Sequence, residues 1–385
     1  MTRLHDLHSV AGQSPWIDNI RRDYLSGGKL AALVDEGVRG VTSNPTIFAK
    51  AIESDNAYDD QLGDLRRDHS IEECYWNLVS DDIRGALKIL RSVYDASDRT
   101  DGFVSIEVSP TLAYDTAATI ESARELHASI NEPNLLVKIP ATLQGVDAVR
   151  QMISEGKSIN VTLIFSLDRY SQVLDAYMAG LETLLASGQD DLSGVASVAS
   201  FFVSRVDTEV DARINAIARR GHDSSAPLRT TPLVRQEDLA ALLGTAALAQ
   251  AKLAYRLFVE SLTTDRWQLL ASHGARPQRP LWASTSTKNP AYSDLMYVEN
   301  LIAPDTVNTM PDATLEAFLE HGVIKRTADL EVDAAQEAID ALGNVGIDLE
   351  DVSAVLESEG VEAFRKSFDE VLACLDAKAS SLATG

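Results

Sequence analysis

Cysteine is scarce in this chain, and a long hydrophobic run is absent. The two cysteines, Cys74 and Cys374, lie far apart in the sequence and form no Cys-x-x-Cys pair. A disulfide framework is therefore excluded, and a reducing, cytoplasmic setting is expected. The longest apolar stretch, Gly194–Val203, has about half of the ~20 residues that a membrane helix requires. Because the first residues also lack the apolar core of a signal peptide, we expect a cytoplasmic protein with no membrane partner.

Basic residues are also few relative to acidic ones. The chain has 34 Lys and Arg against 58 Asp and Glu, a formal net charge of −24. Nucleic acids and anionic membranes are bound by basic surfaces, so a nucleic-acid partner is not expected. Because no Gly-x-Gly-x-x-Gly, no His-Glu-x-x-His and no cysteine–histidine cluster occurs, we expect no cofactor and no metal. Gly156-Lys157-Ser158 resembles the end of a P-loop, but Gln151 stands where that motif needs a glycine.

Eight short apolar or β-branched runs alternate with longer segments of helical periodicity. With 385 residues, of which 45% are hydrophobic, the chain can bury a large core. Alternating strands and helices predict parallel strands joined by right-handed crossovers, and eight such units close into a (β/α)8 barrel. We expect a single domain of this fold over residues 1–385. The expected strands are Trp16–Asp18, Val38–Ser43, Gly102–Val108, Leu135–Ile139, Ile159–Phe165, Val195–Val203, Pro280–Ser284 and Thr306–Thr309.

The chain is longer than the barrel requires. A (β/α)8 barrel needs ~250 residues, so about 130 belong to helical insertions and a C-terminal extension. Ile71–Asp98 is expected to form a helical hairpin, and Val210–Leu270 a mainly helical excursion. Residues 311–385, with 17 acidic and 5 basic residues, are expected to form several helices that pack on the barrel. Three glycines are expected to break these helices: Gly343, Gly346 and Gly360.

Polar side chains occur at the end of every predicted strand. In barrels of this kind the carboxyl ends of the strands surround one pocket, so these side chains are candidates for a common site. Side chains alternate along a strand, which places Ser105 and Glu107, or Asn160 and Thr162, on one face. The alternative is that polar residues merely begin loops. The polar residues at the strand ends are Asp18, Asn44, Glu107, Lys138, Asn160, Thr162, Ser200, Arg205, Ser284 and Asn308.

Lys138 is the most informative of these residues, because it lies inside the apolar run Leu135–Pro140. Lysine is almost never fully buried without a partner. Loss of hydration favours the neutral amine, which is a nucleophile that forms Schiff bases with carbonyl compounds. The alternative is an edge-strand lysine whose ammonium group reaches solvent.

Three segments containing these residues resemble a known family. They are GVTSNPTIF at 40–48, NLLVKIPAT at 134–142 and INVTLIFS at 159–166. Further similar segments, VSIEVSP, SFFVSRVD, RPLWAST and TVNTMP, extend the likeness over roughly residues 15 to 311. On these motifs the chain is similar to the transaldolases of the longer bacterial type. The sequence beyond Glu320 contributes no recognisable motif.

The resemblance implies a (β/α)8 enzyme of the pentose phosphate pathway that needs no cofactor. Such an enzyme transfers a dihydroxyacetone unit from sedoheptulose 7-phosphate or fructose 6-phosphate to glyceraldehyde 3-phosphate or erythrose 4-phosphate. By its motif, Lys138 would attack the ketose carbonyl, while Glu107 and a water held by Thr162 would move protons. Asp18 would take the proton of the C4 hydroxyl. The dihydroxyacetone hydroxyls would be bound by Asn44, Asn160 and Ser200.

The phosphate group of such a substrate requires cations. Arg205 is the first candidate, since a guanidinium group can bind phosphate through two hydrogen bonds. The family pattern has Ser-x-Arg after the seventh strand, whereas this chain has Ser284-Thr-Ser286-Thr-Lys288. We therefore expect Lys288 to replace the arginine, with Ser284 and Ser286 as hydroxyl donors. Between the two carboxylates, Glu107 is expected to have the more perturbed pKa.

Other functions remain open from the sequence. A Schiff-base aldolase on the same barrel would release free dihydroxyacetone; Glu107 favours the transferase, because the small aldolase relatives carry an amide there. A barrel used only for binding or assembly is a further alternative. Partners are expected to be small sugar phosphates, and the protein a monomer or homodimer. Trp16 and Trp282 are expected to pack in the core or at its rim rather than to hold a sugar.

Overall fold

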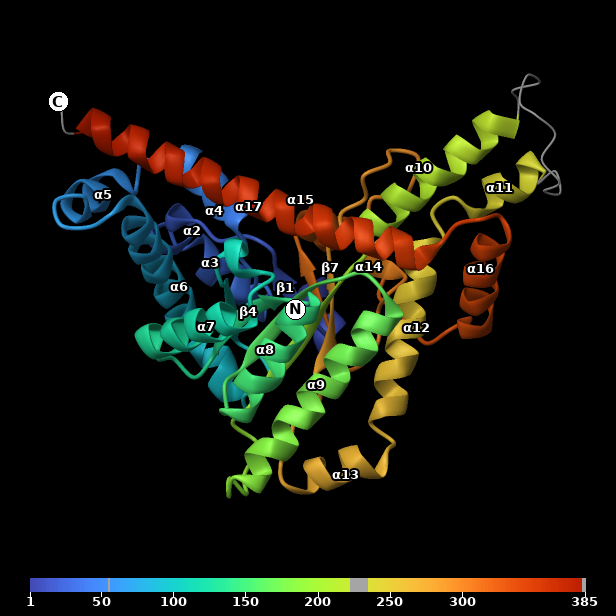
Figure 1. The fold of residues 1–385 in the computed structure, drawn as a ribbon, viewed down its shortest axis with the longest axis horizontal. Helices are drawn as coiled ribbons and strands as arrows, with labels where there is room; N and C mark the ends of the chain where they lie inside the picture. The colour runs from blue at the N-terminus through green and yellow to red at the C-terminus, as the bar shows by residue number, and fades with distance from the viewer. Residues whose placement is uncertain (55, 222–234, 383–385) are drawn as a thin grey trace.

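The computed structural model describes residues 1–54, 56–221 and 235–382. Eight parallel strands close into a barrel in sequence order, and helices surround them (Figure 1). The predicted (β/α)8 fold is therefore confirmed. The strands are β1 (Gln13–Ile17), β2 (Gly40–Val41), β3 (Phe103–Glu107), β4 (Leu135–Pro140), β5 (Ile159–Ile164), β6 (Ser197–Phe202), β7 (Arg279–Ala283) and β8 (Thr306–Met310).

Helices connect the strands and extend beyond them. None of those in the described ranges is long and apolar enough to cross a membrane. They are α1 (Arg3–Ser9), α2 (Arg22–Ser26), α3 (Lys29–Asp35), α4 (Pro45–Ser54), α5 (Asp59–Leu65), α6 (Ile71–Ala96), α7 (Thr116–Ile130), α8 (Leu143–Ser154), α9 (Leu167–Ala186), α10 (Ser204–Gly221), α11 (Gln236–Leu242), α12 (Ala246–Ser261), α13 (Asp265–Ser272), α14 (Met296–Glu299), α15 (Asp312–His321), α16 (Val332–Asn344) and α17 (Leu349–Leu382), with a 3-10 turn at Pro110–Leu112.

Two large aromatic side chains of the strands are fully buried. Trp16 and Trp282 have no exposed surface, so their predicted role in packing is confirmed. Gly40 in β2 lies against the Trp16 indole, and a Cβ atom at this position would lie 2.4 Å from two ring carbons. Because no larger residue fits beside the indole, the glycine of the GVTSNP segment is explained by packing.

The first insertion differs from the predicted hairpin. Ile71–Ala96 forms one continuous helix, α6, which begins with a capping box between Ser70 and Glu73. Its apolar residues recur on one face along the whole length and bury that face against the barrel, so no turn interrupts it. In the second insertion, Gly244, with a φ of +71°, separates α11 from α12. Part of that predicted excursion, residues 222–234, lies outside the described residues.

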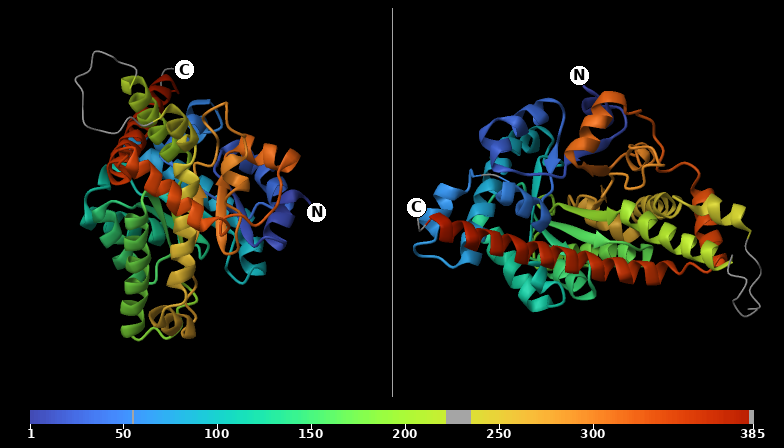
Figure 2. Two further views of the ribbon diagram at one scale, coloured as in Figure 1. Left: turned by 90° about the vertical axis from the view of Figure 1, so that its right-hand side faces the viewer. Right: turned by 90° about the horizontal axis from the view of Figure 1, so that it is seen from above.

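The C-terminal helices also differ from the prediction. Gly346, with a φ of +88°, separates α16 from α17, but Gly360 lies inside α17 and does not break it. Figures 1 and 2 show α17 running along the molecule from the side of α16 to the side of α5. A Cβ atom at Gly360 would lie 3.0 Å from Leu163 Cδ2 and 3.6 Å from Arg205 Nη1. The glycine therefore permits close packing of a helix on the barrel instead of ending the helix.

Candidate active site

Three predicted site residues lie side by side on adjacent strands. Strand register pairs Glu107 of β3 with Lys138 of β4, and Lys138 with Asn160 of β5. Lys138 is 4% exposed, and its Nζ lies 3.2 Å from Glu107 Oε2. The same Nζ donates a hydrogen bond of 2.8 Å to the carbonyl oxygen of Ser43. The lysine is thus buried with an acidic partner and does not reach out to solvent from a sheet edge.

A cavity of about 380 Å³ opens at the carboxyl ends of the strands, beside Lys138. Its walls come from most of the strand ends, from α4 and from α17, so residues distant in sequence meet there. The lining residues are Asp18, Thr42, Asn44, Thr46, Ile47, Lys50, Lys138, Thr162, Ser200, Phe202, Arg205, Ala283, Ser284, Ser286, Lys288, Thr309, Pro311 and Phe364.

Burial raises the pKa of both carboxylates of the site, Asp18 and Glu107. Burial raises the pKa of Asp18 above its ordinary value, against the hydrogen bond from Thr42 and the charges of Lys138 and Arg205. Burial likewise raises the pKa of Glu107, against the charge of Lys138. Both groups are displaced toward neutrality, which suits side chains that take up and release protons. The expectation that Glu107 is the more perturbed of the two stays a prediction.

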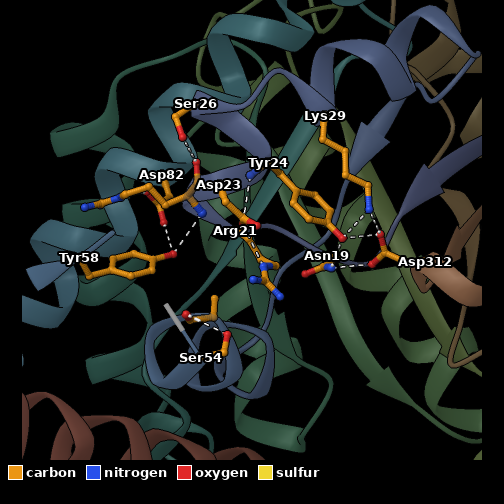
Figure 3. A network of polar contacts seen from close by, with 12 residues as sticks. Asn19, Arg21, Asp23, Tyr24, Ser26, Lys29, Ser54, Tyr58, Asp82 and Asp312 are labelled. Carbon is orange, nitrogen blue, oxygen red and sulfur yellow. Dashed lines mark hydrogen bonds and ion pairs between the residues drawn. The ribbon is translucent and has the colours of Figure 1, made fainter. Parts of the chain in front are cut away.

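Asp18 is held by short-range contacts at the end of β1. Thr42 Oγ1 lies 2.6 Å from Asp18 Oδ1 and 2.6 Å from Thr309 Oγ1. In the loop that follows, Asn19 donates to Asp312 at 2.5 Å. Tyr24 also donates to Asp312, at 2.7 Å (Figure 3). The start of α15 therefore anchors the loop that carries this carboxylate.

A second anchor for the same loop lies on α6. Arg22 Nε donates to Asp82 Oδ1 at 2.8 Å, and the Arg22 guanidinium lies 4.3 Å from the centre of the Tyr58 ring. The Tyr58 hydroxyl donates to the other oxygen of Asp82 at 2.8 Å (Figure 3). Since Asp82 is 2% exposed and paired on both oxygens, this contact ties the start of α2, where the loop ends, to the insertion helix.

The end of β5 departs from regular strand geometry. The pairing of β5 with β6 shifts between Val161 and Ile164, and Leu163 has a φ of +59°. This leaves Thr162 facing the cavity, with its buried Oγ1 unpaired within the described part of the chain. An unpaired buried hydroxyl next to an open cavity is suited to bind a water molecule or a substrate group.

Asn160 is placed differently from the other predicted substrate-binding residues. It has no exposed surface, and it is absent from the cavity lining. Its amide group donates to Ser105 Oγ at 3.0 Å and accepts from Ser200 Oγ at 2.7 Å. Asn160 therefore lies beneath the cavity floor and contacts the cavity through Ser200, while Asn44 lines the wall directly.

Besides Lys138, three cations border the cavity. Arg205 follows β6, Lys288 follows β7, and Lys50 lies on α4; the last was not predicted. Within the described residues, none of the three is in ion-pair contact with a carboxylate. Burial together with the charges of Arg205 and Lys50 lowers the pKa of Lys288. Unneutralised positive charge in a cavity of an acidic protein is suited to bind an anion.

Several lining residues could not be found from the sequence motifs. Phe364 of α17 lies over Lys138, with 6.0 Å between Nζ and the ring centre, although it is far along the chain. Lys50 lies four residues after Thr46 and so on the same face of α4, but Thr46 was itself not predicted to belong to the site. Thr309, rather than the predicted neighbour Asn308, reaches the cavity.

The chain is similar to known proteins over nearly its whole length. Residues 15–375 match the family described as Transaldolase/Fructose-6-phosphate aldolase. A transaldolase of Acidothermus cellulolyticus is 51% identical over 370 residues, which cover 95% of this chain and 94% of the relative. A transaldolase of Thermobifida fusca is 50% identical over 94% of this chain and 95% of its own length. One of Mycolicibacterium smegmatis is 48% identical over 94% of each chain.

Proposed function

Because the chain belongs to the transaldolase/fructose-6-phosphate aldolase family and its relatives support transaldolase activity, we propose that it transfers a dihydroxyacetone unit through a Schiff base on Lys138. The donor is a ketose phosphate such as sedoheptulose 7-phosphate or fructose 6-phosphate. The acceptor is an aldose phosphate such as glyceraldehyde 3-phosphate or erythrose 4-phosphate. This activity belongs to the pentose phosphate pathway, and the two free thiols of Cys74 and Cys374 suit a reducing, cytoplasmic location.

Lys138 begins the reaction. Its Nζ attacks the C2 carbonyl of the ketose, and the resulting carbinolamine loses water to form an iminium ion. The neighbouring Glu107, 3.2 Å away, delivers the proton that this water needs to leave. A water molecule on the unpaired hydroxyl of Thr162 relays protons between these groups.

Asp18 performs the next proton transfer. Its carboxylate takes the proton of the C4 hydroxyl, the C3–C4 bond breaks, and the bonding electrons move into the iminium group to form an enamine. The aldose phosphate leaves. The same steps in reverse, with an acceptor aldehyde, form the new carbon–carbon bond and regenerate the free amine of Lys138.

The remaining residues bind the substrate: neutral groups bind its hydroxyls, and cationic groups bind its phosphate. The hydroxyl of Ser200, oriented by Asn160 beneath it, and the amide of Asn44 bind the dihydroxyacetone hydroxyls. Arg205 and Lys288, with the hydroxyls of Ser284 and Ser286, bind the phosphate group. The single observation that carries the proposal is the buried amine of Lys138, paired with Glu107 and opening into this cavity.

Borohydride trapping tests the covalent step. The protein is incubated with fructose 6-phosphate, reduced with borohydride and analysed by peptide mass spectrometry. We expect a mass increase corresponding to reduced dihydroxyacetone on Lys138. The variant Lys138→Ala should give no adduct, while its thermal unfolding stays cooperative. An unmodified Lys138 in the native protein would refute the Schiff-base proposal.

A second assay separates transfer from simple cleavage. Fructose 6-phosphate is supplied with and without erythrose 4-phosphate, and the release of glyceraldehyde 3-phosphate is followed. We expect sustained turnover only when the acceptor is present. Turnover independent of acceptor, with free dihydroxyacetone as product, would assign the chain to the aldolase activity of the same family.

A further inference from the structure

The two elements that carry the phosphate-site cations are tied together behind the cavity. Arg205 belongs to the first turn of α10, and Lys288 to the connection between β7 and α14. Residues two positions apart on a helix point in directions about 200° apart. Asp207 therefore points away from Arg205, into the protein, and Asp211, one turn later, lies on the same face as Asp207.

Each of these two carboxylates accepts one hydrogen bond from a backbone N–H group and one from a tyrosine hydroxyl. One oxygen of Asp207 accepts from the backbone N–H of Ala247 at 2.8 Å, and the other from the Tyr297 hydroxyl at 2.8 Å. Asp211 repeats this pattern further along the helix. Its Oδ1 accepts from the N–H of Gly244 at 2.9 Å, and its Oδ2 from the Tyr292 hydroxyl at 2.6 Å.

The position of Tyr292 depends on the backbone conformation at Gly244. Gly244 has a φ of +71°, and a Cβ atom there would lie 2.8 Å from Tyr292 Cζ. The tyrosine ring therefore rests on a position that only glycine can occupy without displacing the ring. Burial and the adjacent carboxylates raise the pKa of both tyrosines, so both hydroxyls remain donors at neutral pH.

Tyr292 is coupled to Lys288 through a short, internally bonded turn. Thr287 Oγ1 donates to the carbonyl oxygen of Ser293 at 2.8 Å, which closes the segment between them. Lys288 Nζ donates to Ser286 Oγ at 2.6 Å. A tether on Tyr292 therefore restrains the segment on which the Lys288 ammonium group is carried.

A contact at the cavity, between Ser204 and the lining residue Ser284, completes the connection. Ser204 Oγ and Ser284 Oγ lie 2.9 Å apart, and Ser204 N donates to the carbonyl oxygen of Ser284 at 3.1 Å. Ser284 has a φ of +56°, an uncommon conformation for a residue with a side chain. The start of α10 and the start of the β7 connection are thus joined both at the cavity and behind it.

From this geometry we propose that Asp207 and Asp211, through Tyr297 and Tyr292, are positioning residues that set the spacing of Arg205 and Lys288 for a phosphate group. The inference rests on the proposed function, because it concerns the phosphate of the same substrates. None of the four residues lines the cavity, so their effect on binding passes through the two cations.

Tyrosine-to-phenylalanine variants test the proposal with little change to packing. Inorganic phosphate serves as the probe, and its dissociation constant is measured by isothermal titration calorimetry. For the double variant Tyr292→Phe/Tyr297→Phe we expect the dissociation constant for phosphate to rise about tenfold. Without the two hydroxyl contacts, Arg205 and Lys288 are no longer held at the spacing at which both can bind one phosphate ion. Arg205→Ala should abolish phosphate binding. Tyr177→Phe is the matched control, since it removes a buried hydroxyl bonded to the Arg276 carbonyl, away from the cavity, and should leave the constant unchanged.

Borohydride trapping supplies a readout that a general loss of structure would not give. Half-maximal trapping on Lys138 should need about tenfold more fructose 6-phosphate in the double variant. With unphosphorylated fructose, the half-maximal concentration should stay within about twofold, because no phosphate is bound. If the double variant unfolds, Tyr292→Phe alone should shift the phosphate constant in the same direction by a smaller factor.

The outcomes separate the two proposals. Unchanged phosphate affinity in the double variant, or no phosphate binding by the native protein, would overturn the positioning role. Equal losses with fructose and fructose 6-phosphate would also overturn it. A native protein that forms no adduct on Lys138, while phosphate affinity still depends on the tyrosine hydroxyls, would refute the Schiff-base function and leave the positioning role supported.

Discussion

Two buried carboxylates at opposite ends of β3 differ in how completely they are paired with cations. Asp101 precedes the strand and Glu107 ends it, and both are less than a tenth exposed. Asp101 is surrounded by donors. Ser14 donates to it at 2.6 Å, Arg39 at 2.7 Å and Arg279 at 3.1 Å.

The pKa values of the two groups diverge accordingly. Burial acts to raise the pKa of Asp101, but the Arg279 and Arg39 guanidinium groups outweigh it and hold the pKa below its ordinary value. Burial raises the pKa of Glu107, and the ion pair with Lys138, together with the charge of Arg205, opposes this shift without outweighing it. A fully paired buried charge stabilises the barrel, whereas an incompletely paired one beside a cavity is available for chemistry.

The largest expected effect follows from removing the charge at the cavity end. Glu107→Gln keeps the size of the side chain but cannot shuttle a proton. We expect kcat to fall by about 10²–10⁴-fold, the usual contribution of a general acid–base group. The measurement is steady-state transfer from fructose 6-phosphate to erythrose 4-phosphate. Turnover within about threefold of the native protein would contradict the role of Glu107.

At the opposite end the same kind of change should act on stability. Asp101→Asn leaves Arg39 and Arg279 without their buried partner, so we expect the free energy of unfolding to fall by about 3–5 kcal/mol. Kinetic constants of the folded fraction should not change. Asp98→Asn is the matched control: its carboxylate is 90% exposed, and less than about 0.5 kcal/mol is expected. Urea unfolding gives the loss of stability in both variants. Equal losses in Asp101→Asn and Asp98→Asn would show that the buried pairing of Asp101 contributes no special stability.

Asp207 is an intermediate case: within the described part of the chain its carboxylate has hydrogen bonds but no ion pair with a cation. Burial raises its pKa from 3.8 to about 6. The folded state then binds the proton more tightly than the unfolded state. Its contribution to stability is therefore greatest below pH 4 and is lost as the pH rises through about 6, by about 3 kcal/mol in total.

This behaviour can be measured by substitution. In Asp207→Asn that loss is absent, so the stability of the variant relative to the native protein should increase as the pH rises from about 4.5 to 7. Urea unfolding across this range gives the difference directly. Parallel stability curves for the two proteins would show that Asp207 has an ordinary pKa.

The smallest effect is expected from an exposed cation. Lys50→Met removes one positive charge at the cavity border, and KM for phosphorylated substrates should rise about threefold with kcat unchanged. Arg99→Met is the matched control, since it removes an exposed cation that lines a cavity at the amino-terminal end of the barrel. A similar rise in KM for both variants would indicate a general charge effect and no role in binding.

Most of the strand-end residues could be predicted because their positions are local. Alternation in LLVKIP places Lys138 among buried neighbours, and parallel pairing brings the carboxyl ends of all strands to one edge of the barrel. Asp18, Glu107 and Arg205 follow from the same argument. The structure brings Asp18, Lys138 and Arg205 to one cavity and places Glu107 beside Lys138.

Other features depend on contacts between distant segments. The glycine at 360 looks like a helix breaker, yet tertiary packing of α17 on Leu163 keeps the helix continuous. Phe364 reaches Lys138 only because of that packing. The alternation of side chains correctly predicts that Asn160 points into the barrel. Whether it lines the cavity or lies beneath it and contacts Ser200 depends on its depth in the barrel, which periodicity does not specify.

The sequence by itself determined the (β/α)8 barrel and the position of Lys138 within an apolar strand, because these rest on periodicity and on alternation within single strands. Tertiary structure decided which charges are left incompletely paired. Asp101 and Glu107 are both acidic residues beside one apolar strand, and only three-dimensional packing gives the first two guanidinium groups and the second a single lysine. Pairing of buried charges depends on distances between segments far apart in sequence, and these distances exist only in the folded chain.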